Sequence, residues 1–124
     1  MPIIENLFML TFGHALADFV LQPEAMGYGK NRNDKIHDKE RSLFPVWWYW
    51  LSAHALVHGG VVYLITNSVL LGIVETILHW ITDFSKCEGW ISVHQDQFIH
   101  IGCKVGYAFV IWLYPISIGI LNSP

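Results

Sequence analysis

Histidine and carboxylate residues recur four positions apart inside otherwise apolar stretches of this chain. His14 and Asp18 form one such pair, and His79 and Asp83 repeat it, each pair being followed by a phenylalanine. The residues that share this spacing are His14, Asp18, His54, His58, Glu75, His79, Asp83, Asp96 and His100. Residues at positions i and i+4 lie on the same face of an α-helix. Each stretch therefore predicts a helix with a single polar stripe.

In combination, these residue types are metal ligands. Imidazole nitrogens and carboxylate oxygens together suit Zn, Mn or Fe rather than Ca or Mg alone. Burying an ionised aspartate near the centre of a bilayer costs ~2.5–3.5 kcal/mol, an interhelical hydrogen bond returns about 0.6 kcal/mol, and a structural zinc site returns ~10–16 kcal/mol. We therefore predict one or two divalent ions, zinc first and manganese or iron as alternatives, with a metal-free proton relay or plain structural polarity as competing interpretations. The predicted ligands are His14, Asp18, His54, His58, His79, Asp83, Asp96 and His100.

One titratable residue breaks the repeat. The position that corresponds to Glu75 in the first half of the chain is Leu10, so symmetric metal binding does not need this carboxylate. We predict that Glu75 is either a general base or the hydrogen-bond partner of a ligating imidazole. Gln22 and Gln97 are predicted to orient substrate or ligands.

The composition of the chain points to a membrane. Its 124 residues suffice for one domain, 53% of them are hydrophobic, only 14% are charged, and the mean hydropathy is +0.40. A soluble domain has about 25% charged residues. The net charge of −3 gives no reason to expect a nucleic-acid partner. Cys87 and Cys103 are expected to be reduced thiols, and the first residues lack the positive region of a secretory signal.

Four apolar stretches are long enough to cross a bilayer, which takes roughly 20 residues. They cover residues 3–22, 44–66, 68–86 and 96–121. The polar segment 23–42 holds five of the seven Lys and Arg residues, which places it on the cytoplasmic side. We expect an all-α fold, namely a membrane-embedded four-helix bundle. It would form one transmembrane domain over residues 1–124, multi-pass in the bacterial inner membrane, with a homo-oligomer left open.

Smaller features refine this expectation. Asn67 and Ser68 predict a tight turn between the second and third spans. Gly102 and Gly106 form a small-xxx-small pattern that predicts close helix approach, and Pro115 predicts a kink in the fourth span. Spans one and three run in the same direction, so the repeated motif is compatible with a parallel two-fold internal repeat.

The stretches "HALADFVLQ", "HALVH", "LHWITDFSK" and "DQFIH" together resemble a family of small bacterial and phage polytopic membrane proteins, a domain of unknown function. The family pattern is His-x3-Asp-Phe-x-x-Gln, His-x3-His, His-x3-Asp and Asp-Gln-x-x-His, and the resemblance covers nearly the whole chain. It implies an intramembrane bundle with a shared polar centre and supplies no activity. The positions that it carries over are His14, Asp18, Gln22, His54, His58, His79, Asp83, Asp96, Gln97 and His100.

Two functions of different classes follow. The first is a metal-dependent hydrolase that acts on a lipid-linked ester or phosphoester at the membrane interface, which a looser similarity to predicted inner-membrane metal-dependent hydrolases also implies. The second is a non-enzymatic protein that relays protons or ions, or a phage or bacterial factor that acts on a membrane partner. The outer half of the fourth span, from Gly106 on, has no strongly titrating residue, which favours a closed site over a pore. Action on a partner remains open.

Overall fold

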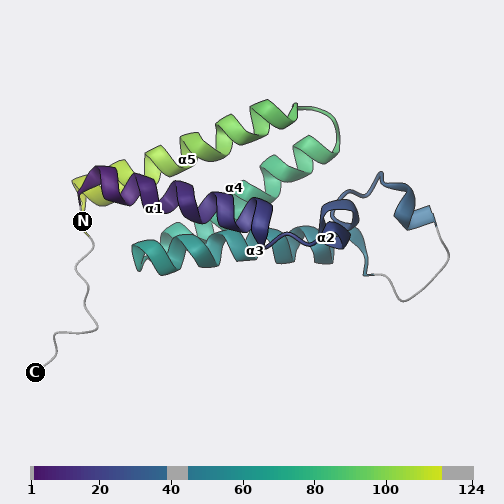
Figure 1. The fold of residues 1–124 in the computed structure, drawn as a ribbon, viewed down its shortest axis with the longest axis horizontal. Coiled ribbons are helices and arrows are strands. Elements are labelled where there is room, and N and C mark those ends of the chain that lie inside the picture. The colour runs from purple at the N-terminus through teal and green to yellow at the C-terminus, as the bar shows by residue number, and fades with distance from the viewer. Residues whose placement is uncertain (1, 39–44, 116–124) are drawn as a thin grey trace, which may run out of the picture.

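The computed structural model describes residues 2–38 and 45–115 and confirms an all-α fold with four long helices packed together. Figure 1 shows α1, α3, α4 and α5 side by side, with the short helix α2 at one end of the bundle. The long helices are α1(Ile3–Ala15), α3(Trp47–Thr66), α4(Val69–Cys87) and α5(Val93–Leu113). The short elements are the π-helical turn η1(Leu16–Val20), α2(Glu24–Gly29) and the 3-10 turn η2(Lys35–Asp38).

The first predicted helix ends in a π-helical turn that the sequence did not predict. The backbone N–H of Leu21 donates to Leu16 O at 2.9 Å, which is a bond from i to i−5. Such single π turns are frequent at functional sites. Here the turn contains Asp18, so the change in helical pitch sets the direction of one candidate ligand.

The predicted break between the second and third spans is confirmed. Asn67 adopts a left-handed conformation with φ 54° at the end of α3, and the Ser68 hydroxyl accepts from Leu71 N at 3.2 Å at the start of α4. Glycine permits close contact in this hairpin, because a Cβ on Gly59 would lie 2.5 Å from Gly72 O. The close approach predicted at Gly102 and Gly106 is wrong, since both residues are exposed and a Cβ on either would have no neighbour among the described residues.

Helix α5 begins three residues before the predicted span and ends before its proline. Ser92 and Gln95 form a capping box, in which Gln95 N donates to Ser92 Oγ at 3.1 Å. The helix ends at Leu113 because the residue before a proline is disfavoured in the helical conformation. The predicted kink at Pro115 is therefore wrong for the described residues, and residues 116–121 of the predicted span lie outside them.

The long helices alternate in direction. Helices α1 and α4 run one way, α3 and α5 run the other way, and the end of α5 lies beside the start of α1 (Figure 1). Helix α1 packs against α3 and α5, and α4 packs against the same two helices. The bundle thereby turns one face of every helix toward a shared centre.

One described helix is long and apolar enough to cross a membrane by length and composition, namely Ile3–Val20 near the N-terminus. The other three predicted spans form helices of comparable length but do not meet this measure, so four membrane crossings are not supported by hydropathy. The polar stripes account for the difference, since buried histidines lower the mean hydropathy of α3, and buried histidine, carboxylate and lysine side chains lower that of α4 and α5.

Candidate metal centre

The interior of the bundle is polar. All of the histidines and carboxylates spaced four apart are buried, and the four long helices together with η1 contribute them. The buried titratable side chains are His14, Asp18, Lys30, His54, His58, Glu75, His79, Asp83, Asp96, His100 and Lys104. Their burial on one side of each helix places the polar stripes in a common centre, because i and i+4 residues share a face.

A first group of ligand atoms has the dimensions of a tetrahedral metal site. Asp18, His54, His58 and His79 each offer one atom, and these atoms lie within 4.8 Å of one another. Asp18 Oδ1 lies 3.2 Å from His54 Nε2 and 3.6 Å from His58 Nε2. Metal–ligand bonds of about 2.0–2.2 Å in a tetrahedron place neighbouring ligands about 3.3–3.6 Å apart. The three side chains are therefore already spaced as ligands of one ion.

A second group shares His79 with the first. Glu75, His79 and His100 also offer atoms within 4.8 Å of one another. The His79 ring stacks on His58 at 3.6 Å and on His100 at 4.1 Å between ring centroids. Glu75 Oε1 lies 3.5 Å from His79 Nδ1 and 3.9 Å from His58 Nδ1. Glu75 thus faces the ring nitrogens of two imidazoles of the first group.

Several buried imidazole nitrogens make no hydrogen bond. They are His14 Nδ1, His54 Nε2, His58 Nε2, both ring nitrogens of His79, and His100 Nε2. Buried polar atoms are otherwise nearly always paired, and each one left unpaired costs ~1–3 kcal/mol. His54 Nε2 and His58 Nε2 face Asp18, and His100 Nε2 lies 3.2 Å from Asp96 Oδ1. Imidazole and carboxylate atoms that converge without hydrogen bonds between them are what a cation site requires, and the residues present therefore fit a bound metal ion.

Gln97 connects the remaining candidate ligands to Asp18. Its Nε2 donates to Asp18 Oδ2 at 2.7 Å and to Asp96 Oδ2 at 3.3 Å. Its Oε1 lies 3.1 Å from His14 Nε2 and accepts from it. His14 belongs to neither group of ligand atoms; its Nε2 lies 3.8 Å from Asp18 Oδ2, and the Gln97 amide bridges the two side chains. The predicted orienting role of Gln97 thus corresponds to contacts with three titratable side chains.

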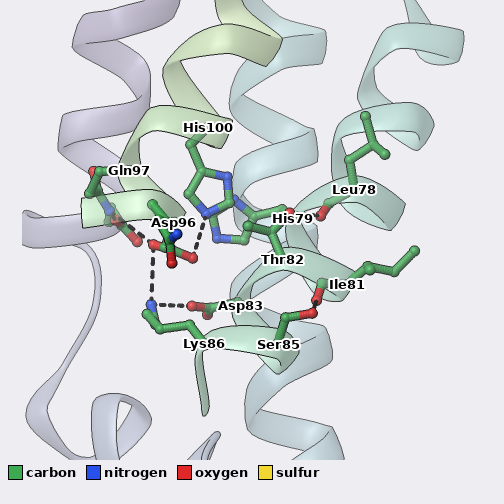
Figure 2. A network of polar contacts seen from close by, with 12 residues as sticks. Leu78, His79, Ile81, Thr82, Asp83, Ser85, Lys86, Asp96, Gln97 and His100 are labelled. Carbon is green, nitrogen blue, oxygen red and sulfur yellow. Dashed lines mark hydrogen bonds and ion pairs between the residues drawn. The ribbon is translucent and has the colours of Figure 1, made fainter. Parts of the chain in front are cut away.

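Asp83 and Asp96 lie outside the two ligand groups and beside lysines, although Asp83 Oδ2 lies 3.6 Å from His54 Nε2 and Asp96 Oδ1 lies 3.2 Å from His100 Nε2. Lys86 forms an ion pair with Asp83 and lies 3.5 Å from Asp96 Oδ2 (Figure 2). Lys30 Nζ donates to Asp83 Oδ2 at 2.6 Å and to Gln22 Oε1 at 2.5 Å. The predicted orienting residue Gln22 therefore contacts Lys30. The ammonium groups of Lys30 and Lys86 compensate the charges of Asp83 and Asp96.

Sequence analysis missed the role of Lys104. Its side chain is fully buried, and Nζ donates to Glu75 Oε1 at 2.5 Å. Tyr107 donates its hydroxyl to Glu75 Oε2 at 2.9 Å, so both carboxylate oxygens are engaged. The signal was present, because Lys104 follows His100 at the same spacing of four. No such periodicity marks Lys30, which enters the centre from α2 as its C-cap residue.

The segment after α2 is fastened to the end of α4. Arg32 Nε and Nη2 donate to the two oxygens of Glu88 at 2.6 and 2.9 Å, and the guanidinium lies 5.3 Å from the Phe84 ring centroid. The hydrogen bond from Arg32 holds the pKa of Glu88 below its usual value. This ion pair between Arg32 and Glu88, here called the latch, holds the segment that carries Lys30 in place.

His94, near the start of α5, is exposed.

Comparisons with known proteins supply a family and no activity. No curated protein and no solved structure matches the chain. Residues 6–118 match the family described as protein of unknown function (DUF3307), and these residues contain every candidate ligand described above. Because the match spans nearly the whole chain, this protein belongs to the DUF3307 family.

Proposed function

We propose that this chain is an intramembrane metal-binding protein and that its buried centre is the site of a metal-dependent hydrolase. The observation that carries the proposal is the placement of Asp18 Oδ1 at 3.2 Å from His54 Nε2 and 3.6 Å from His58 Nε2, at the spacing of tetrahedral ligands. His79 would complete the set. A divalent ion at this position lowers the pKa of bound water to about 7 and polarises an ester or phosphoester.

The residues around these ligands support a functional rather than a purely structural centre. Gln97 holds Asp18 Oδ2, so Oδ1 is left to face the imidazoles. Glu75 faces the Nδ1 atoms of His58 and His79, the position of a carboxylate that orients metal-bound imidazoles through their second nitrogen. Two roles were predicted for Glu75, namely general base and hydrogen-bond partner of a ligating imidazole. This geometry favours the second role.

The substrate class follows from the charges at one end of the centre. Lys86 pairs with Asp83, lies 3.5 Å from Asp96, and keeps 20% of its side chain exposed. Lys30 reaches the same layer from α2. Lys30 is buried and paired with Asp83, whereas the partly exposed Lys86 is the ammonium that an anionic ester, such as a phosphoester headgroup at the membrane interface, would meet.

The distribution of polar and apolar side chains supports a bilayer around the bundle. Ionisable residues inside membrane proteins face the bundle interior, as the buried residues do here. Large apolar side chains point outward instead, including Ile4, Phe8, Phe12, Phe19, Leu64, Leu70, Phe98 and Trp112. Soluble proteins rarely expose large apolar areas. We therefore propose that α3, α4 and α5 cross the inner membrane together with α1, despite their lower hydropathy.

An apolar cluster one turn beyond the polar centre supports a closed site rather than an ion path. Leu10, Val62 and Leu71 are buried in this cluster with Tyr107 and Ala108. Each of the three aliphatic residues lies four positions from a buried histidine or from Glu75 on its own helix. Packed hydrocarbon therefore separates the titratable residues of α1 and α3 from the buried Asn6 and Thr66 one turn further on, and this interruption does not suit continuous conduction.

Metal analysis of detergent-purified protein tests the proposal. The wild-type chain is expected to retain zinc, whereas Asp18→Asn and His54→Ala are expected to lose it together with any zinc-dependent hydrolysis of aryl phosphoesters. Asp38→Asn changes an exposed carboxylate and serves as the matched control for Asp18→Asn. Equal zinc content in the wild type and Asp18→Asn contradicts the metal centre. Zinc binding without zinc-dependent hydrolysis of any ester contradicts the hydrolase alone.

A further inference from the structure

We infer that Lys104 takes the place of a second metal ion, so that the centre holds a single divalent cation in the group of Asp18. The inference rests on the proposed metal centre and determines how many ions it holds. The two ligand groups share His79, and the group formed by Glu75, His79 and His100 would be the site of the second ion. The ammonium of Lys104 already pairs with the carboxylate of that group.

The contact is made by the Glu75 oxygen that faces His79 Nδ1. Glu75 Oε1, which lies 3.5 Å from His79 Nδ1, accepts from Lys104 Nζ at 2.5 Å. The other oxygen accepts from the Tyr107 hydroxyl at 2.9 Å. An ion bound to Oε1 would lie within a few ångströms of a buried ammonium, where like charges repel strongly because little solvent screens them. Lys104 and a second ion are therefore mutually exclusive.

Among the described residues, the ion-pair partner of Lys104 is Glu75. Its side chain is 1% exposed, and Nζ lies 5.6 Å from the centroid of the Tyr107 ring. A buried ammonium needs a paired anion, and Glu75 is the carboxylate that it contacts. The pair is therefore a fixed part of the centre rather than a surface contact.

The internal repeat supports this assignment. A shift of sixty-five positions that aligns His14 with His79 aligns Leu10 with Glu75. A shift of forty-two positions that aligns His58 with His100 aligns Val62 with Lys104. The two apolar residues of one half thus correspond to a carboxylate and an ammonium in the other half. Glu75, the carboxylate that could build a second site, is paired with the ammonium of Lys104. The group of Asp18 is therefore the one site left for a metal ion.

Zinc stoichiometry tests the inference on full-length protein in detergent. After saturation with Zn²⁺ and gel filtration, the wild type is expected to hold about one ion per chain and Lys104→Met about two, because the freed Glu75 can bind metal. Lys104→Arg keeps the charge and is the matched control, expected to hold about one. The double variant Glu75→Gln/Lys104→Met is also expected to hold about one, since it lacks the second carboxylate.

Thermal unfolding of the same variants provides a second readout. Without zinc, Lys104→Met leaves the buried Glu75 without its counter-charge, with the Tyr107 hydroxyl as its remaining donor, and is expected to unfold at a lower temperature than the wild type. Added zinc should raise its Tm more than it raises the Tm of the double variant. Two ions in the wild type, one ion in Lys104→Met, or a Lys104→Met chain that does not fold even with zinc would each overturn the inference. If the wild-type protein bound no zinc, the proposed metal centre itself would be overturned, which is a different result from the three outcomes above.

Discussion

Gln97 Nε2 donates a hydrogen bond of 2.7 Å to Asp18 Oδ2, although the two residues are seventy-nine positions apart in the chain. Gln97 lies on α5 and Asp18 lies in the π-helical turn that follows α1. The bond occupies one carboxylate oxygen and leaves Oδ1 facing His54 and His58. An amide that orients a ligating carboxylate is a common feature of metal sites, and its loss typically costs 10–100-fold in affinity, about 1.4–2.7 kcal/mol.

Replacing Gln97 by leucine is therefore expected to weaken zinc binding about 10–100-fold. The carboxylate of Asp18 would lose the donor to Oδ2 and become free to rotate away from the imidazoles. Competition against a chromophoric chelator measures the change in Kd. His94→Ala, an exposed change on the same helix, is the control and should leave Kd unaltered. An unchanged Kd in Gln97→Leu would mean that this amide does not orient Asp18.

Lys30→Met is expected to destabilise the fold by about 1–3 kcal/mol, because it removes a charged hydrogen bond to the buried Asp83 carboxylate, which keeps Lys86 as its other counter-charge. Lys30 Nζ lies 2.6 Å from Asp83 Oδ2, and both side chains are buried. Unfolding followed in mild detergent measures the loss. Adding Asp83→Asn to Lys30→Met should cost less than the two single changes together, since the first change has already removed one of the bonds to this carboxylate.

Lys35→Met is the matched control for Lys30→Met, because Lys35 is exposed on the same polar segment. Its expected effect is within about 0.5 kcal/mol. If Lys30→Met behaved like this control, the buried ion pair would contribute nothing to the folded state, and the delivery of Lys30 by α2 would have no energetic role.

Much of the fold could be predicted because it depends on local pattern. Long apolar stretches with titratable residues four apart predicted the four main helices, and Asn67 predicted the turn between two of them. The same spacing predicted the burial of the histidine and carboxylate stripes, because residues four apart share a helix face. Lys104 has this spacing too, and its omission was a failure to extend the pattern by one turn.

Other features depend on contacts between distant segments and have no local signal. Lys30 reaches Asp83 only because the segment after the first helix folds back over the end of the bundle. The small residues at the helix contact are Gly59 and Gly72, which lie on different helices, rather than the two glycines of α5. Predicting either contact requires the relative placement of helices, which periodicity within one helix does not contain.

The latch between Arg32 and Glu88 makes a prediction about pH. The hydrogen bond from Arg32 lowers the pKa of Glu88 in the folded chain. A lowered carboxyl pKa contributes stability above the ordinary glutamate pKa of about 4.3, and the contribution is lost as the pH falls through the folded-state value. Arg32→Ala should therefore raise the pKa of Glu88 toward its ordinary value, as measured by carboxyl-carbon NMR.

The neighbouring exposed lysine gives the control for this titration. Lys35→Ala removes a positive charge from the same segment without touching the pair, and it should leave the Glu88 titration unchanged. High salt should shift the wild-type titration in the same direction as Arg32→Ala, because exposed charges are screened. A Glu88 titration that ignored both Arg32→Ala and salt would show that the latch is not formed in solution.

Adjacent glycines on α3 offer a test of the helix contact that closes the bundle. A Cβ on Gly59 would lie 2.5 Å from Gly72 O on α4, whereas a Cβ on Gly60 would meet nothing within 4 Å among the described residues. Gly59→Ala must therefore push α3 and α4 apart and is expected to destabilise the fold by ~1–3 kcal/mol. Gly60→Ala gains helix propensity at no steric cost and should stabilise by about 0.5–1 kcal/mol. Tm values of the two variants in the same detergent decide the matter, and a Gly59→Ala chain as stable as Gly60→Ala would disprove this close contact.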